Sequence, residues 1–303
     1  MEKCVTKTEW RFETEGFIEV QGGRVWYGAT RPTQNTATPL LVLHGGPGMS
    51  HDYLYPLTDL ADERQVVFYD QLDAGRSDRP NEPRNWVLSR FLDEVSAVRD
   101  ALGLSKVCVF GNSWGGTVAA AYAATRPDGL DRLVLSSPLI STDRWIADNQ
   151  RHREQLPPSV QEIMASCEAA GQIEADEYQD AVALFYSRHF CRVDPWPLYV
   201  NESFDVLNEQ CYSSMWGPNE FTCDGVLMGY DGSASLASIE VPVLMTCGEF
   251  DEATPAACRA FSALIPNCEC EVFADSSHLA FVEARASYIA TLRRFLSAIA
   301  TTD

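Results

Sequence analysis

Short apolar runs alternate with longer amphipathic segments along the first 138 residues of the chain. Four runs are continuous: 40–43, 66–69, 107–110 and 133–135. A run of this kind predicts a strand that is buried on both faces, as in a parallel sheet. Apolar residues at steps of three and four over residues 86–102 predict a helix that ends near Gly103. The alternation of strands and helices predicts an α/β fold.

A hairpin is predicted ahead of these strands, because residues 16–20 and 24–27 flank the pair Gly22-Gly23. A further helix is predicted at residues 117–125, which are rich in alanine and end before a proline.

The alternation stops after about residue 138. Helical patterns at residues 159–170 and 177–189, together with many aromatic residues, predict a helical insertion. The alternation then resumes with strands at 243–246 and 270–273, a helix after Pro255 and a last helix at 284–298. We therefore expect residues 1–138 and 231–303 to form the core and residues 139–230 to form a helical lid.

The segment Gly111-Asn112-Ser113-Trp114-Gly115 fits the pattern G-x-S-x-G and lies between a predicted strand and a predicted helix. In this setting the serine occupies a tight, strained turn that exposes its hydroxyl at the end of the sheet. The two glycines leave room for the strand and the helix to approach each other. Ser113 is therefore the candidate nucleophile, and an ordinary glycine-rich turn is the alternative.

A serine hydroxyl is a weak nucleophile at neutral pH and needs a base. His278, between the last predicted strand and the last predicted helix, is the candidate, and a structural loop histidine is the alternative. The imidazole needs an orienting carboxylate, for which Asp251 and Glu249 compete. We favour Asp251 because it lies further into the loop. The order Ser, Asp, His is also that of the hydrolases with this serine motif.

Backbone N–H groups must stabilise the oxyanion that forms when the serine attacks. The N–H of Trp114, directly after the nucleophile, is one candidate donor. Gly46, in the glycine-rich loop from His44 to Gly48, is the other, and Gly45 beside it is expected to contact the substrate. A phosphate-binding role for this loop is excluded because the pattern G-x-x-x-x-G-K-[ST] is absent.

Composition narrows the possible partners. A formal net charge of −20 argues against nucleic acid and anionic membranes. No stretch approaches the roughly 18 apolar residues of a membrane span, and the first ten residues lack the apolar region of a secretion signal. We expect a cytoplasmic protein whose ten cysteines are reduced thiols. Cys268 and Cys270 lack a matching second pair and nearby histidines, so no metal site is expected, and nothing in the sequence indicates an organic cofactor.

With these residues identified, the chain resembles the proline iminopeptidase family of α/β-hydrolases. The motifs that carry the resemblance are HGGPG at 44–48, GNSWGG at 111–116, GEFDEATP at 248–255 and SSH at 276–278. The resemblance implies an eight-stranded, mostly parallel sheet flanked by helices, with a helical lid inserted between the sixth and seventh strands. It also implies release of an N-terminal residue, often proline, from short peptides, or hydrolysis of amino-acid amides.

The resemblance further suggests Glu220 and Glu252 as acidic anchors for the free amino group of the substrate. A buried ammonium needs a counter-charge, which agrees with this assignment. The alternatives are a solvated lid residue for Glu220 and a carboxylate in a loop or at the start of a helix for Glu252. Asp73 replaces a glycine of the family pattern, and this change either alters substrate choice or is harmless.

Two other functions remain open from the sequence. One is an esterase or amidase that acts on a secondary metabolite, and the other is a non-catalytic binding protein on a hydrolase fold. The two glutamates argue against the first, and the complete set of serine, histidine and aspartate argues against the second. The expected partner is a small peptide or amino-acid amide, and the sequence indicates no oligomeric state.

Overall fold

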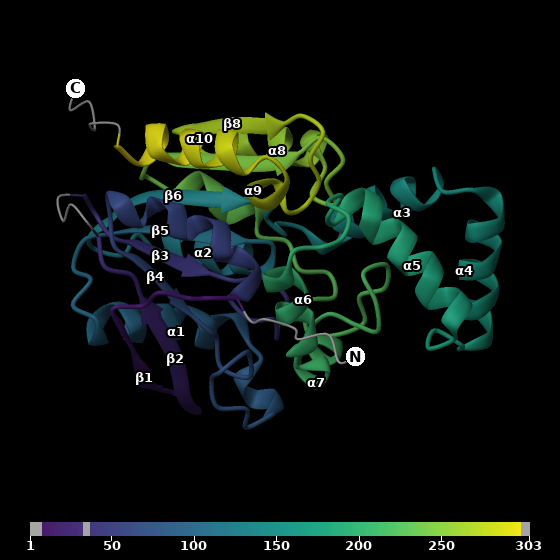
Figure 1. Cartoon of the computed structure of the whole chain (residues 1–303), viewed down its shortest axis with the longest axis horizontal. Helices are drawn as coiled ribbons and strands as arrows, with labels where there is room; N and C mark the ends of the chain where they lie inside the picture. The colour runs from purple at the N-terminus through teal and green to yellow at the C-terminus, as the bar shows by residue number, and fades with distance from the viewer. Residues whose placement is uncertain (1–7, 33–36, 298–303) are drawn as a thin grey trace.

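The computed structural model describes residues 8–32 and 37–297. One eight-stranded sheet crosses the molecule in the order β1-β2-β4-β3-β5-β6-β7-β8 (Figure 1). The strands are β1 (Thr14–Val20), β2 (Gly23–Ala29), β3 (Leu40–Leu43), β4 (Val66–Tyr69), β5 (Val107–Asn112), β6 (Leu130–Ser136), β7 (Val243–Gly248) and β8 (Cys268–Phe273). The pairs β1–β2 and β2–β4 are antiparallel and the other five pairs are parallel. This architecture confirms the predicted α/β fold.

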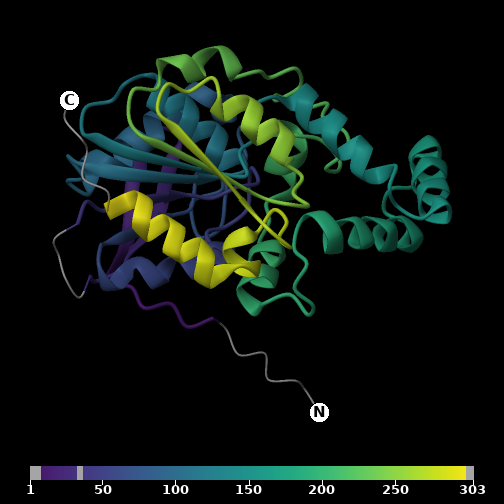
Figure 2. The ribbon, with the colours of Figure 1, turned by 90° about the horizontal axis from the view of Figure 1, so that it is seen from above.

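Strand β3 explains why the continuous apolar runs predict strands correctly. Leu41 and Leu43 belong to one hydrophobic core, whereas Leu40 and Val42 belong to a second core, because successive side chains point to opposite faces of the sheet. The first core is covered by α1 (Leu88–Ala101), α2 (Trp114–Ala124) and α8 (Pro255–Ser262). The second core is covered by the 3-10 helix η1 (Asp52–Asp62), α9 (Ala280–Glu283) and α10 (Arg285–Ser297). Figure 2 shows α8 and α10 on opposite sides of the sheet.

The predicted start of one helix is wrong. The helix predicted at 117–125 begins three residues earlier, at Trp114, because Gly115 and Gly116 continue the helix despite their low propensity. The helix predicted at 284–298 corresponds to α10, and the short helix α9 precedes it; residue 298 lies outside the described residues.

Five α-helices lie between β6 and β7: α3 (Thr142–Arg153), α4 (Pro158–Ala170), α5 (Asp176–His189), α6 (Leu198–Asp205) and α7 (Glu209–Met215). Helices α4 and α5 project away from the sheet (Figure 1) and share a small core of their own that includes Met164 and Phe185. Helix α6 packs on η1. The sequence predicts α4 and α5 but not α3, α6 or α7. Two further 3-10 helices are η2 (Pro83–Asn85) and η3 (Ser233–Ser238).

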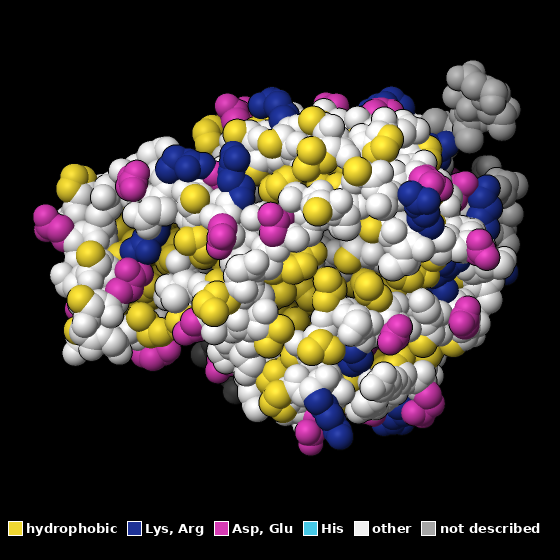
Figure 3. All heavy atoms as spheres, turned by 180° about the vertical axis from the view of Figure 1, so that it is seen from behind, with side chains coloured by type: hydrophobic (Ala, Val, Ile, Leu, Met, Phe, Trp, Pro, Cys, Tyr) yellow, Lys and Arg dark blue, Asp and Glu magenta, His cyan; other side chains and the backbone are white. Residues whose placement is uncertain are grey.

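The described part of the chain can be searched for membrane-spanning helices, disulfide bonds, metal-binding clusters and basic surface patches. None of its helices is long and apolar enough to span a bilayer. The nine cysteines of the described residues form no disulfide bonds. Residues 1–7, which include Cys4 and most of the ten-residue N-terminal segment, lie outside the described residues. Within the described part no cluster of three or more potential ligands could hold a metal ion. Figure 3 shows acidic and basic side chains interspersed over one face, without a continuous basic stripe on that face.

Candidate active site

Ser113 lies at the junction of β5 and α2 with φ 54° and ψ −119°, a strained conformation for a residue with a side chain. The glycines around it explain how the turn closes. A Cβ on Gly111 would lie 2.2 Å from the carbonyl oxygen of Gly115, and a Cβ on Gly115 would lie 2.3 Å from that of Leu43. Only glycine fits at these two positions, and the tight packing leaves the Ser113 side chain at the end of the sheet.

Asp251 is buried, and its carboxylate accepts four hydrogen bonds. Oδ1 lies 2.9 Å from Nδ1 of His278 and accepts the N–H of Ala253 at 2.8 Å. Oδ2 accepts the N–H of Gly248 at 3.0 Å and the hydroxyl of Ser137 at 2.6 Å. These bonds hold the carboxylate in one orientation against the imidazole. The contribution of Ser137 was not predicted from the sequence.

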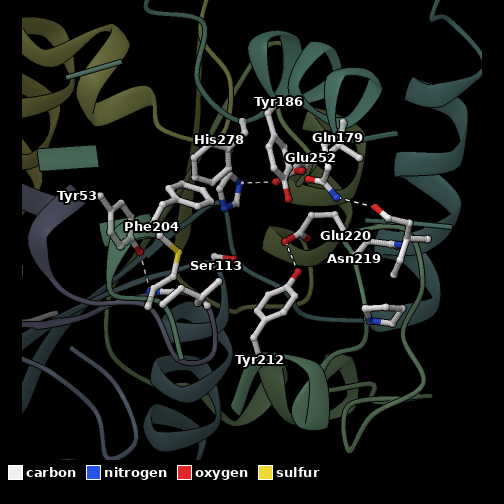
Figure 4. Close-up of a pocket in the computed structure, with 18 of the residues that line it drawn as sticks. Tyr53, Ser113, Gln179, Tyr186, Phe204, Tyr212, Asn219, Glu220, Glu252 and His278 are labelled. Carbon is white, nitrogen blue, oxygen red and sulfur yellow. Dashed lines mark hydrogen bonds and ion pairs between the residues drawn. The ribbon is translucent and has the colours of Figure 1, made fainter. Parts of the chain in front are cut away.

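The structure brings Ser113 and His278 into the wall of one cavity of about 270 Å³ (Figure 4). Asp251 lies behind the histidine. Glu249, the competing carboxylate, is exposed and accepts the N–H of Asp275 at 3.1 Å. Of the two acidic residues in this loop, Asp251 is therefore the one that orients the imidazole.

Gly46 also lines the cavity, and its φ of 111° is one that glycine adopts without strain. A Cβ at this position would lie 2.8 Å from the backbone nitrogens of Gly48 and Met49. Within the described ranges, neither the N–H of Gly46 nor that of Trp114 has a hydrogen-bond partner. Both groups can therefore donate to a substrate oxygen.

Gly45 lines the cavity too, but its N–H donates to the hydroxyl of Tyr53 at 2.6 Å. Tyr53 in turn donates to Oδ1 of Asn112 at 2.7 Å, and Asn112 Nδ2 donates to the carbonyl of Ser136 at 3.1 Å. These bonds connect the glycine-rich loop to the turn that carries the serine. The sequence analysis missed Tyr53, although the polar Asn112 at the end of an apolar strand could have indicated a buried partner.

Glu220 and Glu252 face the same cavity (Figure 4). Glu252 is buried, its Oε2 lies 4.0 Å from Nδ1 of His278, and its Oε1 has no hydrogen-bond partner among the described residues. Burial and then the charges of Glu220 and Asp251 raise the pKa of Glu252 well above its usual range. Burial also raises the pKa of Glu220, although a hydrogen bond from the Tyr212 hydroxyl opposes this effect. A cation bound beside this pair would offset the burial and the mutual repulsion that disfavour the two ionised carboxylates.

The rest of the cavity wall is mainly apolar and comes largely from the helices between β6 and β7. Its large side chains include Met49, Tyr186, Phe190, Phe204, Leu207 and Tyr212. The sequence indicated an aromatic-rich insertion but not which of its residues would reach the serine, because that depends on how α5, α6 and α7 pack.

Asp73 is buried but does not line the cavity. Its Oδ1 accepts the N–H of Asn81 at 2.7 Å, and its Oδ2 accepts the indole N–H of Trp86 at 2.9 Å. Its backbone has φ 68°, in the left-handed region that glycine adopts readily. Asp73 therefore stabilises its own loop, and it has no direct contact with the cavity through which to alter substrate choice.

Comparisons with known proteins agree with this geometry. Residues 38–284 match the family model described as the alpha/beta hydrolase fold. A proline iminopeptidase from Heyndrickxia coagulans is 40% identical over 287 residues, which cover 94% of this chain and 99% of the relative. Further proline iminopeptidases, from Thermoplasma volcanium among others, are 36% identical or less over comparable lengths.

Solved structures of similar proteins also include a proline iminopeptidase. A proline iminopeptidase from Mycobacterium smegmatis has a TM-score of 0.89 and 35% identity, and the match covers 93% of this chain and 97% of that one. The structure of VinJ has a TM-score of 0.91 and 35% identity, with coverage of 94% and 98%. Esterases at 18–22% identity share the fold. The chain belongs to the proline iminopeptidase family of α/β-hydrolases.

Proposed function

We propose that this protein is a serine aminopeptidase that releases an N-terminal residue, with proline as the leading candidate, from short peptides or amino-acid amides. The observation that carries the proposal is the pair Glu220 and Glu252 in the cavity of Ser113. A free amino group is the part of such a substrate that two carboxylates select. The names of the relatives, which are proline iminopeptidases, support proline as the released residue.

In the proposed reaction Ser113 attacks the carbonyl carbon of the first residue while His278 accepts the hydroxyl proton. Asp251 holds the tautomer of His278 in which Nδ1 carries a proton, so that Nε2 serves as the base. The N–H groups of Gly46 and Trp114 stabilise the oxyanion, and a single donor of this kind typically contributes about 100- to 1,000-fold in rate. His278 then donates the proton to the leaving amine, and water hydrolyses the acyl-enzyme by the same route.

The glutamate pair explains why the enzyme would release one residue and not cleave within a chain. The ammonium of the first residue binds beside Oε1 of Glu252, which has no protein partner within residues 8–32 and 37–297. The carbonyl that then reaches Ser113 is that of the same residue, the first of the peptide. An acetylated substrate lacks the charge, so it leaves both carboxylates without a counter-ion.

The apolar wall suits a compact apolar first residue such as proline. Tyr186 and Phe204 contribute large apolar surfaces, and Gly45 supplies backbone without a side chain. In this proposal residues 139–230 act as a lid that completes the pocket for the first residue. The reaction needs neither a metal nor an organic cofactor, because serine, histidine and aspartate supply the nucleophile and the base. We further propose that the enzyme works in the cytoplasm with reduced thiols.

Replacement of the nucleophile tests this proposal. Ser113→Ala should abolish hydrolysis of L-prolyl anilide and labelling by a fluorophosphonate, while the melting temperature stays close to that of the wild type. Mass spectrometry of the labelled wild type should place the adduct on Ser113. Ser277→Ala is a matched control, because Ser277 is a buried serine that is bonded to Glu283 and lies outside the cavity. Hydrolysis of prolyl anilide by Ser113→Ala at the wild-type rate would exclude the assignment. A wild type that hydrolyses only simple esters would instead favour the esterase alternative.

A further inference from the structure

Two histidines outside the proposed catalytic set lie directly behind it. His152 belongs to α3 and His189 ends α5, and their rings stack with centroids 3.9 Å apart and planes inclined by 23°. Nε2 of His152 lies 3.0 Å from the carbonyl oxygen of Asp251, and Nδ1 of His189 lies 2.7 Å from that of Phe250. A carbonyl oxygen only accepts, so each imidazole must carry its proton on the nitrogen that faces the carbonyl.

The backbone at the end of α5 also reaches the loop that carries His278. The backbone N–H of His278 donates to the carbonyl of His189 at 3.1 Å, and the next residue, Leu279, donates to the carbonyl of Phe190 at the same distance. The end of α5 therefore contacts both the loop that carries Asp251 and the loop that carries His278.

One face of α3 packs against the loop that carries Asp251 and Glu252. Asp148 accepts the hydroxyl of Thr254 at 2.6 Å, and Trp145 packs edge-on against the ring of His278 with centroids 5.6 Å apart. With His152 these residues recur at the three- and four-residue spacing of one helical face. Helix α3 thus contacts the loop on both sides of Glu252.

The surroundings keep the pair neutral. Burial lowers the pKa of His152, and its Nδ1 is buried without a hydrogen-bond partner in the described part of the chain. Burial and then the neighbouring His152 lower the pKa of His189 to about 4. The cations that face the pair, Arg151, Arg188 and Arg192, also disfavour protonation, and the carboxylate of Asp251 opposes them. Both rings can therefore donate to their carbonyls while remaining stacked.

We propose that His152 and His189 are positioning residues of the proposed hydrolase reaction. Each N–H fixes one carbonyl of the loop that presents Asp251 and Glu252, and the backbone of His189 fixes His278. The pair thereby sets the position of the acid and the base relative to Ser113. This inference rests on the proposed function only because that function assigns Ser113, Asp251 and His278 to catalysis.

Two sets of variants separate the hydrogen bonds from the packing. His152→Phe and His189→Phe keep a stacked ring and remove the N–H donor. His152→Gln and His189→Asn remove the ring and keep an N–H, because the amide nitrogen of Gln can reach the position of Nε2 and that of Asn the position of Nδ1. The measured quantity is the second-order rate of fluorophosphonate labelling at Ser113, which needs the base but not the amine anchors. Melting temperatures confirm that each variant is folded.

We expect the Phe variants to label about 10- to 100-fold more slowly, because an unpaired carbonyl lets the loop move and small displacements in a catalytic group are costly. The Gln and Asn variants should recover most of the rate. The far-downfield proton resonance expected for His278 Nδ1 against Asp251 should broaden in the Phe variants and return in the amide variants. Phe variants that label at the wild-type rate would overturn the proposal, as would amide variants that are as slow as the Phe variants. A wild type that labels at Ser113 but does not cleave prolyl anilide would contradict the proposed function instead.

Discussion

Replacement of Glu252 by Gln should lower activity and raise stability together. The substrate ammonium loses one charge-assisted hydrogen bond, which is worth about 1.5–3 kcal/mol. This loss corresponds to a fall of about 10- to 150-fold in kcat/KM for a substrate with a free amino group. An acetylated substrate does not use this bond, so its rate should change little. The expected signature is therefore a loss of preference for the free amine.

The stability effect follows from the raised pKa of Glu252. Burial and the charge of Glu220 make the ionised side chain unfavourable in the folded protein, whereas in the unfolded chain it ionises near pH 4.3. Because the folded-state pKa is the higher one, stability is lost as pH rises above about 4.3. Glutamine removes that cost, so the gain in melting temperature should be present at pH 7 and absent near pH 4.

The assay compares kcat/KM for L-prolyl anilide and its N-acetyl form across Glu252→Gln, Glu220→Gln and a control. Glu174→Gln is the matched control, because Glu174 also lines the cavity but is exposed. It should leave both rates and the melting temperature unchanged. The reasoning is refuted if Glu252→Gln retains wild-type kcat/KM for the free amine. It is equally refuted if both substrates lose activity to the same extent.

Three further substitutions test other parts of the site. Asp251→Asn should lower kcat by roughly 10,000-fold through the wrong imidazole tautomer, without a change in fluorescence or circular dichroism, and activity above a tenth of wild type would contradict its role. Tyr53→Phe leaves the N–H of Gly45 without its acceptor. A cost of about 1–3 kcal/mol should appear in chemical denaturation, and an unchanged midpoint would disprove the connection. Gly115→Ala would place a Cβ 2.3 Å from the carbonyl oxygen of Leu43. It should yield no soluble folded protein, and a normal thermal transition would refute the packing argument.

The strands and the serine turn could be predicted because local sequence determines them. Residues 40–43 are apolar throughout since the sheet is covered on both faces, and Gly111 and Gly115 are required by backbone contacts in the turn itself. The glycine-rich loop could be located for the same reason. The choice between Glu249 and Asp251 rested only on their distance from the strand, and the structure shows the physical difference between them, which is burial against His278.

Helix α3 could not be predicted because, apart from Trp145, its buried residues are polar. Asp148 and Asn149 are buried, and His152 is bonded to a carbonyl of the loop that follows β7, which lies about a hundred residues away in the sequence. No apolar periodicity results, so the helix has no signal in the hydrophobic pattern. The contact of Tyr212 with Glu220 depends in the same way on the packing of α7.

The most direct test of the central claim is the hydrolysis of paired substrates by the wild-type enzyme. A panel of amino-acid anilides, with proline among them, would be measured with free and with acetylated amino groups, and Ser113→Ala would serve as the blank. The account predicts cleavage of the free-amine forms, with prolyl anilide among the best, and much slower cleavage of the acetylated forms. Equal cleavage of both forms would contradict an exopeptidase site anchored by Glu220 and Glu252.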